Sequence, residues 1–471
     1  IDPAARTPCS RLYDGVDYVP LPRWRIFLIQ LLNIAGLGPI FGAVLGAAYG
    51  PVAFLWITFG GIFMGAAHDF IAGVISLRHD GASLPETAGV YLGGGMKIVM
   101  RLFSAGLMIL VGAVFLSQPA SLVAARFDVP SLEGIAFGGF SWLLLIVLGV
   151  ILVYYIAATL LPVDKIIGRI YPIFGGILLF SAIGVFIGLF VKGYPLVEVW
   201  NNVWEYNGVF NYSEYFANGH FFPIFFVTVA CGILSGFHST QTAIISRTMK
   251  SERQGRNTFY NMMILEGFIA MVWAAGAMGV YNLGLQAADT SLATKTVGIV
   301  CKDILGNVGG IIALLGVIVL PITSGDTALR ALRMSVADTL HIKQDSNGKR
   351  LALSAVIFAL VAAILVWAKS SPAGFTILWR YFAWANQTLA LFAFVCISVW
   401  MFENGKSKWV WMPLIPGAFY AFVTITYIMN AAIGFNLPWT AAYIIGTVCA
   451  AAYLVGIIMY GKKRAAKVKL A

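Results

Sequence analysis

Two short stretches combine residue types that could bind a ligand inside otherwise apolar runs. Residues 34–42 hold Pro39 among glycines, and residues 231–241 hold serine, histidine, threonine and glutamine side chains beside two glycines. Proline removes a helical hydrogen-bond donor, and glycine lowers the cost of leaving the helix. Irregular backbone at membrane depth is tolerated where it lines a cavity or is buried in protein. These stretches therefore predict two interrupted helices with a substrate between them.

Interrupted helices offer binding groups of both signs. An interruption leaves N–H groups at one half-helix end and C=O groups at the other, which suit a carboxylate and a cation respectively. His238 is also a candidate proton acceptor, because imidazole titrates near neutral pH. A proline kink with small-residue packing is the structural alternative. The predicted substrate-binding residues are Gly36, Gly38, Ser235, Gly236, His238, Ser239, Gln241, Asn386 and Gln387.

A second polar set consists of hydroxyl groups and carboxylates inside apolar runs. Asp326 lies among hydroxyl side chains in residues 320–328, Glu266 lies mid-way along its run, and Asp69 ends a glycine-rich run. Carboxylates are costly in the membrane, and oxygen ligands suit a hard cation or a proton. The structural alternatives are an Asp326–Arg330 pair and a hydrogen-bonded Glu266. The predicted cation- or proton-coupling residues are Thr323, Ser324, Asp326, Thr327, Glu266 and Asp69.

The composition places these residues in a membrane protein. Of the 471 residues, 60% are hydrophobic and 11% are charged, whereas a soluble globular protein carries roughly a quarter charged residues. Apolar runs long enough to cross roughly 30 Å of hydrocarbon recur along the chain. The twelve predicted spans are 25–49, 52–77, 98–124, 140–162, 166–191, 221–246, 258–281, 308–332, 351–369, 373–401, 409–430 and 438–460.

The basic residues support this set of spans. If successive connections lie on alternate sides, one side holds 25 Lys and Arg residues and the other holds 5, with Arg380 inside a span. Cytoplasmic loops carry such an excess, so both ends of the chain are predicted to be cytoplasmic. The net charge of +11 is therefore a topology signal, and nucleic acid is not an expected partner.

The two predicted interruptions lie in the first and sixth spans, five helices apart. An odd offset makes those helices antiparallel, which is the pattern of an inverted five-plus-five repeat with its binding site between the interruptions. We predict an all-α polytopic membrane protein with one transmembrane domain over residues 1–471. The first repeat would cover 25–191, the second 221–401, and two additional helices 409–460.

Motifs for covalent or cofactor chemistry are absent from the sequence. We find no phosphate loop, no metal-ligand cluster and no nucleophile–base–orienter set, and the five cysteines form no CxxC pair. We therefore expect neither an enzyme nor a cofactor. The expected partners are a small-molecule or peptide substrate, a coupling ion and the lipid bilayer.

Six stretches together resemble the carbon starvation protein A family. The first begins DGVDYVP, the second and fourth contain the predicted interruptions, and the order along the chain is that of the family. The stretches are residues 14–20, 34–42, 69–70 with 78–81, 235–241, 321–326 and 379–388. Members typically begin with a further hydrophobic helix. Because this chain starts at Ile1 without it, we expect a missing preceding segment.

The resemblance implies a fold and a function. It implies a bacterial inner-membrane importer of the amino acid–polyamine–organocation superfamily, with a leucine-transporter-like core that agrees with the inverted repeat. It also implies uptake of peptides or pyruvate, with proton symport for pyruvate. Together these observations predict a cation-coupled symporter, with protons as the expected ion. A membrane nutrient sensor without transport activity and a channel are the alternatives.

Overall fold

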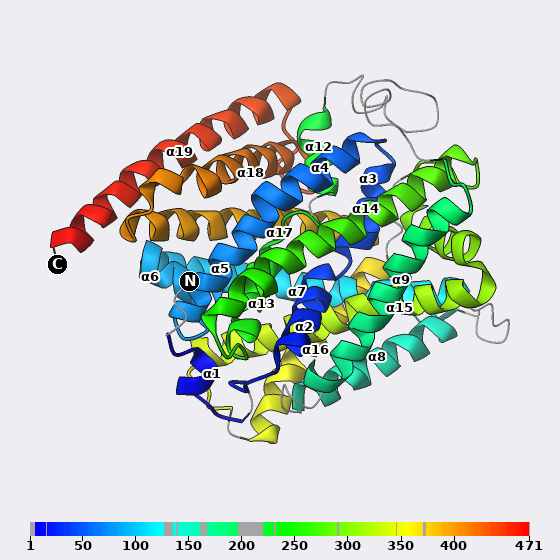
Figure 1. Ribbon diagram of the computed structural model, residues 1–471, viewed down its shortest axis with the longest axis horizontal. Helices are drawn as coiled ribbons and strands as arrows, with labels where there is room; N and C mark the ends of the chain where they lie inside the picture. Colours follow the sequence, from blue (N-terminus) through cyan, green and yellow to red (C-terminus); the bar gives the residue numbers. More distant parts are fainter. Residues whose placement is uncertain are drawn as a thin grey trace.

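The computed structural model describes residues 5–470 except 16, 127–134, 138–139, 161–166, 196–219, 230–231, 290–291, 345 and 371–373. Helices dominate this part of the chain (Figure 1). The strands assigned within it are β1 (Ile135–Phe137) and β2 (Phe140–Ser141), which pair antiparallel in one connection. The predicted all-α fold class is confirmed.

The helices account for all twelve predicted spans. Within the described residues, nine helices are long and apolar enough to cross a membrane, and a tenth span is the bent pair 23–35 and 38–47. The shorter apolar helix α8 and the separated helices α12 and α13 occupy the remaining two predicted positions. Each predicted span thus coincides with a helix or a pair of helices, and ten of the twelve are long and apolar enough to cross a membrane within the described residues.

The helix bounds follow in chain order. The first half of the chain forms α1 (Pro8–Arg11), α2 (Arg23–Ala35), η1 (Gly38–Gly42), α3 (Ala43–Ala47), α4 (Val52–Gly60), η2 (Gly61–Gly65), α5 (Ala66–Arg78), α6 (Leu84–Leu92), α7 (Gly94–Arg126), α8 (Trp142–Leu160) and α9 (Ile167–Val191). The second half forms α12 (Phe221–Thr228), α13 (Gly236–Ser246), η4 (Glu252–Gln254), η5 (Arg256–Tyr260), α14 (Asn261–Asn282), α15 (Ala293–Thr339), α16 (Asn347–Ser370), α17 (Gly374–Glu403), η7 (Ser407–Trp409), α18 (Trp411–Asn430) and α19 (Trp439–Leu470).

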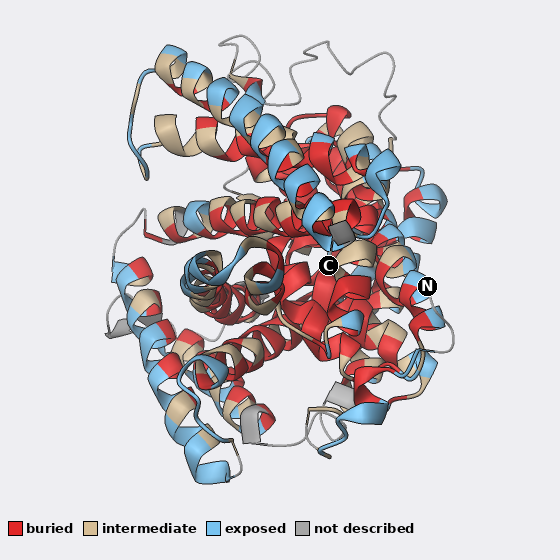
Figure 2. Cartoon of the chain, turned by 90° about the vertical axis from the view of Figure 1, so that its left-hand side faces the viewer, coloured by how far each residue is buried: buried red, intermediate tan, exposed pale blue. Residues whose placement is uncertain are grey.

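Burial separates central helices from peripheral ones. The most apolar window of α17 is 83% buried, whereas that of α19 is 17% buried. Figure 2 shows buried residues concentrated in the middle of the molecule and exposed residues along the outer helices. Many of the exposed side chains are large and apolar, among them Phe63, Val150 and Val308. Exposed apolar surface of this kind is stable against lipid and costly against water.

The long helix α15 links the central elements. It packs along α7 and α9, and it also contacts α2 and α13. Its described extent, Ala293–Thr339, exceeds the predicted span 308–332 because residues before and after that span are also helical. The helix is kinked at Gly306, which has a φ of 70°. Glycine adopts this backbone conformation readily, whereas it is strained for other residues.

Helices α18 and α19 form a hairpin beside the core (Figure 1). The hairpin is fastened to the start of the sixth span, because the Tyr443 hydroxyl donates to the Phe222 carbonyl and the Trp439 ring stacks on His220 with centroids 4.1 Å apart. Tyr381 of α17 donates to the Ile433 carbonyl at 2.6 Å. Helices α18 and α19 therefore hold the α12 half of the broken sixth span in place.

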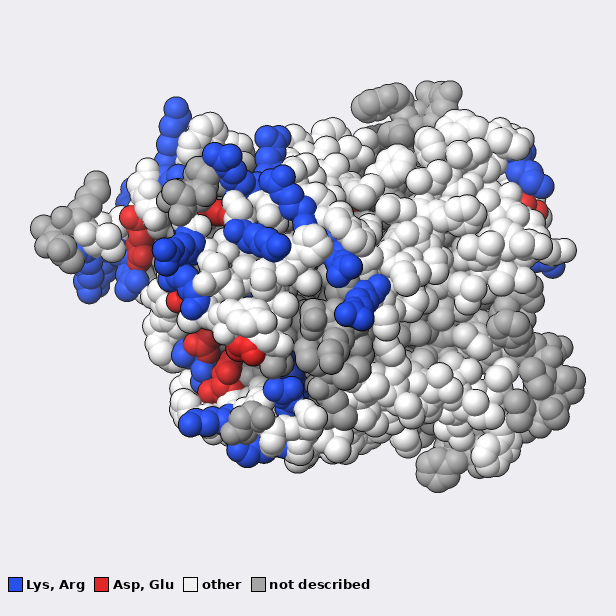
Figure 3. Space-filling model, turned by 60° about the horizontal axis from the view of Figure 1, so that its bottom comes forward, with Lys and Arg blue, Asp and Glu red and all other residues white. Residues whose placement is uncertain are grey.

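The basic side chains gather at one end of the molecule. Figure 3 shows this end covered by Lys and Arg, while the opposite end carries few of them on the face in view. Three residues that entered the sequence count, Arg126, Lys165 and Lys469, lie outside the part whose side chains are described. The arrangement agrees with the unequal distribution of basic residues that the sequence predicts.

One feature of the second span was not predicted from the sequence. Between α4 and α5 the helix widens into the π-helical turn η2 (Gly61–Gly65). Such turns are rare and are found frequently at functional sites. A Cβ added at Gly65 would overlap the Ile233 carbonyl oxygen, so this glycine lets the second span approach the break in the sixth span.

Replacing this glycine should therefore destabilise the protein. We expect Gly65→Ala to lower the free energy of unfolding by about 1–3 kcal/mol, the usual cost of overpacking. The matched control is Gly61→Ala in the same turn, where a Cβ meets nothing within 4 Å. Thermal unfolding of the detergent-solubilised variants measures the difference, and equal melting temperatures for the two variants would contradict the close approach at Gly65.

Candidate functional site

The first span is interrupted where its glycines and proline predicted. Helix α2 ends at Ala35, and Gly36 follows with φ 34° and ψ −127°. The chain then resumes at Gly38 and is bent by 51° relative to α2. A Cβ at Gly36 would lie 3.1 Å from the Phe115 ring and 3.4 Å from the Ser324 hydroxyl, so the turn is packed tightly against α7 and α15.

The sixth span is interrupted as well. Helix α12 ends at Thr228, and α13 begins at Gly236 after Ser235, whose backbone is extended. Gly232 between them has φ 99°. A Cβ at Gly232 would lie 3.0 Å from the Gly38 carbonyl carbon and oxygen. The two interruptions, nearly two hundred residues apart in the chain, therefore lie directly against each other.

Two neighbouring side chains of α17 hold the second interruption. Asn386 Oδ1 accepts a hydrogen bond from the Phe237 amide at 2.9 Å, and its Nδ2 donates to Ser235 Oγ at 2.9 Å. Gln387 Nε2 donates to the carbonyls of Phe226 and Val227 at 3.0 and 2.9 Å. Asn386 thus accepts a hydrogen bond from a free N–H group at the start of α13, and Gln387 donates to free carbonyls at the end of α12. Both side chains contact backbone that a continuous helix would have satisfied itself.

A polar network joins the first and sixth spans to each other. Gln241 of α13 donates to Gln30 Oε1 at 3.1 Å and accepts from Asn33 Nδ2 at 3.4 Å. Gln30 and Asn33 stand in the last turns of α2 before the interruption. All three side chains are fully buried. The hydrogen bonds between them therefore compensate for the hydrogen bonds to water that the side chains lose on burial.

The hydroxyl groups of α15 meet the same turns of α2. Ser324 Oγ donates to the carbonyls of Leu32 and Asn33 at 3.0 and 3.2 Å, and Thr327 Oγ1 donates to Asn33 Oδ1 at 2.8 Å. Thr323 donates to carbonyls of its own helix instead. Ser324 and Thr327 therefore form a cluster of five oxygens with three oxygens of α2.

Asp326 faces a different neighbour. Tyr171 of α9 donates a hydrogen bond to Asp326 Oδ2 at 2.8 Å, and the Tyr171 oxygen also lies 2.8 Å from the Thr323 carbonyl. The carboxylate is 1% exposed, and its Oδ1 has no hydrogen-bond partner among the described residues. Arg330, the expected helical partner, donates to the Ala158 carbonyl and lies 4.0 Å from Asp17.

Asp69, His238 and Glu266 converge on one buried cluster, whereas Ser239 donates to the Gly236 carbonyl of its own helix at 2.9 Å. Asp69 Oδ2 lies 2.9 Å from His238 Nδ1, and Asp69 Oδ1 lies 2.8 Å from His68 Nδ1. His238 Nε2 lies 3.2 Å from the Ile34 carbonyl oxygen and 3.9 Å from Glu266 Oε2. Four titratable side chains from α5, α13 and α14 thus meet the last turn of α2. Two of them, Asp69 and Glu266, were predicted as coupling residues and one, His238, as a substrate contact.

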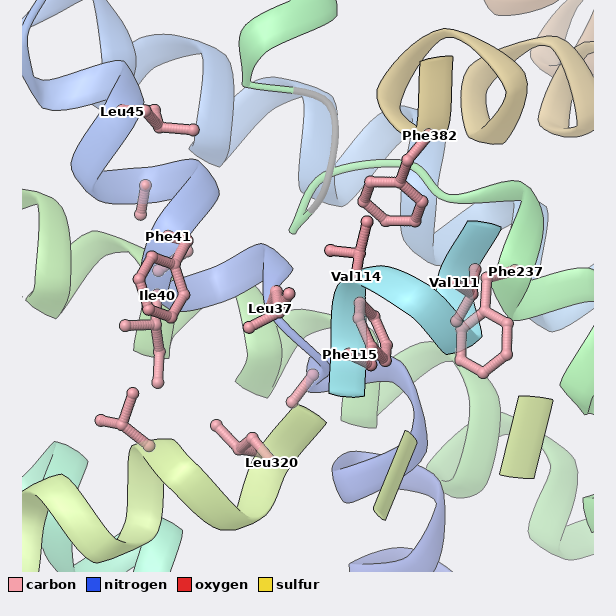
Figure 4. Close-up of a cluster of buried hydrophobic side chains, with 14 of the residues drawn as sticks. Leu37, Ile40, Phe41, Leu45, Val111, Val114, Phe115, Phe237, Leu320 and Phe382 are labelled. Carbon is pink, nitrogen blue, oxygen red and sulfur yellow. The ribbon is translucent and has the colours of Figure 1, made fainter. Parts of the chain in front are cut away.

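Apolar side chains enclose the first interruption on its other side. Figure 4 shows Leu37 beside Val114 and Phe115 of α7, with Leu320 of α15 nearby. The ring of Phe115 also contacts Phe237 and Phe382, with centroids 6.3 and 5.8 Å away. The interruptions are therefore bounded by polar groups on one side and by aromatic rings on the other, which is the usual composition of a small-molecule site.

The stretch that begins DGVDYVP folds across the basic end of the molecule. The Tyr18 hydroxyl donates to the Asp80 carbonyl at 3.1 Å, and Arg11 pairs with the Asp80 carboxylate. The Leu21 amide donates to the Thr248 carbonyl at 3.1 Å. This segment therefore ties the loop after α5 to the loop after α13.

The sequence prediction missed four side chains of these networks. They are Gln30, Asn33, His68 and Tyr171. Gln30 and Asn33 left a signal, because they are polar residues three apart inside an apolar run and just before the first interruption. Tyr171 left none, since a tyrosine in a membrane helix is common whether or not its hydroxyl binds a partner.

Comparison with known proteins agrees with this architecture. The family described as "Carbon starvation protein CstA" matches residues 1–146, 135–291 and 274–427. The chain belongs to this family. A Haemophilus influenzae protein named "Uncharacterized membrane protein" is 41% identical over 60% of this chain and 84% of its own length. The proteins named "Peptide transporter CstA" from Escherichia coli and Mycobacterium tuberculosis are 24% and 26% identical over 90% and 89% of this chain, and over 76% and 70% of their own lengths.

Solved transporters share the fold. A manganese transporter from Eremococcus coleocola superposes with a TM-score of 0.63 at 10% identity, covering 97% of this chain and 99% of the transporter. MhsT, solved with L-phenylalanine, superposes with a TM-score of 0.60 at 14% identity, covering 94% of this chain and 99% of MhsT. The leucine-transporter-like fold is confirmed, and this member of the family is a multi-pass membrane transporter.

The role of Asn386 at the second interruption can be tested by substitution. We expect Asn386→Ala to cost about 1–3 kcal/mol of unfolding free energy, because it leaves the buried Phe237 amide without its acceptor. The matched control is Thr388→Ala, two residues on, where the lost hydroxyl bonds to a carbonyl of its own helix. Thermal unfolding in detergent measures both variants, and an Asn386→Ala protein as stable as the control would contradict the assignment.

Proposed function

We propose that this chain is a secondary active transporter that imports a small carboxylate-bearing nutrient, either a peptide or a pyruvate-like acid, by symport with a cation. The observation that carries the proposal is the direct contact between two interrupted spans at the centre of the fold. Interrupted helices in this position bind substrate and ion in inverted-repeat transporters, and alternating access moves one bundle around that fixed site.

The substrate class follows from the groups at the interruptions. We place the substrate beside Gly36 and Gly38 of the first span and Ser235 and Gly236 of the second. The N-terminal end of α13 points its partial positive charge at this place, which favours a carboxylate. The relatives named peptide transporters support a peptide, and a pyruvate-like acid presents the same carboxylate. Proximity to the interruption extends the proposed contacts to His238, Ser239, Gln241, Asn386 and Gln387.

The coupling cation has two candidate positions. One is the oxygen cluster formed by the hydroxyl groups of Ser324 and Thr327 and the carbonyls of Leu32 and Asn33. A hard cation bound there would be coordinated by these oxygens and would replace the hydrogen bonds that the hydroxyl groups now donate. Thr323 and Asp326 lie on the same turns of α15 but contact other neighbours. The other is the cluster of Asp69, His238 and Glu266, which offers titratable groups and therefore suits a proton. We propose the proton as the coupling ion.

The orientation and the repeat follow from the same evidence. We place the protein in the bacterial inner membrane with the basic end and both ends of this chain in the cytoplasm, because Lys and Arg gather at that end (Figure 3). The repeats are 25–191 and 221–401, each beginning with an interrupted span, and 409–460 forms the additional hairpin. The contact between the two interruptions supports this division.

Transport by the purified protein in liposomes tests the proposal. We expect labelled pyruvate or labelled dialanine to accumulate above its outside concentration when an inward proton gradient is imposed, and not when the gradient is absent. Binding without accumulation under proton and sodium gradients would instead indicate a sensor. Flux that equilibrates the substrate without following a gradient would indicate a channel.

The hydroxyl cluster supplies a second test. We expect Ser324→Ala to leave the proton concentration that half-saturates transport unchanged, because we place the proton at Asp69, His238 and Glu266. A cation bound by the hydroxyl groups would instead need about tenfold more, because a hydrogen bond or ligand to a charged group is worth roughly 1.5–3 kcal/mol. The matched control is Thr339→Ala on the exposed end of the same helix, where the hydroxyl donates to its own helix. Uptake measured against proton and sodium concentration compares the two variants, and a half-saturation raised about tenfold in Ser324→Ala alone would place the cation in the hydroxyl cluster and contradict the proton site.

A further inference from the structure

The two ring nitrogens of His238 both face oxygen atoms. Nδ1 lies 2.9 Å from the Asp69 carboxylate, and Nε2 lies 3.2 Å from the Ile34 carbonyl. A carbonyl and an ionised carboxylate only accept hydrogen bonds, so both nitrogens must donate. The arrangement is therefore satisfied by the doubly protonated, positively charged ring. His238 is 1% exposed, so a singly protonated ring, which would leave one nitrogen facing an acceptor without a hydrogen bond, would be costly.

Asp69 supplies the balancing charge and is itself positioned. Its second oxygen accepts from His68 Nδ1 at 2.8 Å. His68 Nε2 has no hydrogen-bond partner among the described residues, and the ring packs edge-on against Phe394 with centroids 5.0 Å apart. His68 therefore donates with Nδ1 and holds the carboxylate in place. Asp69 and His238 form a buried ion pair whose charges cancel.

Glu266 is the member of this cluster that is left without hydrogen bonds. Neither carboxyl oxygen has a hydrogen-bond partner in the described part of the chain, and the residue is 0% exposed. The charged or titratable groups that act on it there are His238 of α13, whose Nε2 is 3.9 Å away, and Asp69 of α5. A charged carboxylate in this place would be costly, whereas a neutral carboxylic acid fits.

These contacts define a switch with two acceptors for one N–H group. We propose, building on the symport function above, that Glu266 binds and releases the coupling proton, and that its charge decides whether His238 Nε2–H bonds to the Ile34 carbonyl or to Glu266. With Glu266 protonated, the bond goes to Ile34, as in this structure. When Glu266 gives its proton to water, His238 keeps both of its own protons and turns Nε2–H to the new carboxylate.

The position of Ile34 connects this switch to the substrate site. Ile34 lies in the last turn of α2, two residues before Gly36, where the first interruption begins. Losing the bond from His238 leaves a helix-end carbonyl unsatisfied, so the end of α2 must move or find another partner. Proton release and a change in shape at the interruption are thereby one event. In this scheme Glu266 exchanges the proton, and His238, Asp69 and His68 are positioning residues.

The central test replaces Glu266 by its permanently neutral analogue. In proteoliposomes we expect Glu266→Gln to keep exchange of labelled for unlabelled pyruvate or dialanine, because His238 stays bonded to Ile34. We expect accumulation driven by an inward proton gradient to fall about tenfold or more, within the usual range of coupling between sites. The pH dependence of exchange should become flat. The matched control is Glu403→Gln, since Glu403 pairs with Arg464 outside the cluster.

A measurement on the protein without substrate tests the same switch. Infrared titration of wild type should show the carbonyl band of a protonated carboxylic acid that Glu266→Gln removes and Glu403→Gln leaves. His68→Ala should shift the pH at which this band disappears. His68→Gln should bring that pH part of the way back to the wild-type value, because an amide can also donate to Asp69. A residue that only packed would not shift this pH.

Two results would overturn the inference. One is an infrared spectrum in which no acid band depends on Glu266 at any pH. The other is proton-driven accumulation in Glu266→Gln with the pH profile of wild type. If wild type moves no substrate under any gradient, the proposed symport fails, and the infrared titration still decides whether Glu266 and His238 form the switch.

Discussion

Broken backbone at membrane depth is the constraint on which this structure depends. Lipid offers no hydrogen bonds, so the N–H and C=O groups that each interruption frees need partners inside the protein. The second interruption receives them from Asn386 and Gln387, which are neighbours on the largely buried helix α17. The first receives contacts from α15 through Ser324. The packing of α15 and α17 against the interruptions therefore supplies these hydrogen-bond partners.

The last turns of α2 lie between two polar clusters of different chemistry. On one side the carbonyls of Leu32 and Asn33 meet the hydroxyl groups of α15. On the other side the next carbonyl, that of Ile34, meets His238 and through it Asp69 and Glu266. One cluster is suited to a hard cation and the other to a proton. A displacement of this helix end would change both, which gives a physical route from ion binding to a change in access.

Close backbone approach makes this crowding possible. Gly232 lies against Gly38, and a Cβ at Gly236 would overlap the backbone of Asn386 on α17. Small residues at such contacts let membrane helices pack through their backbones. The fold tolerates almost complete replacement of the sequence, since transporters of 10% and 14% identity superpose over nearly the whole chain. What they share is the path of the backbone.

The sequence by itself determined the twelve spans, the side on which basic residues gather and the positions of both interruptions. These features depend on the hydropathy of neighbouring residues and on the local effects of Pro39 and the glycines. Only the tertiary structure decided the partners, because a buried polar side chain bonds to whatever the packing brings near. Asp69 and His238 are 169 residues apart and Gln30 and Gln241 are 211 apart. No local pattern encodes such pairs, so the predicted residues became networks only when the helices were packed.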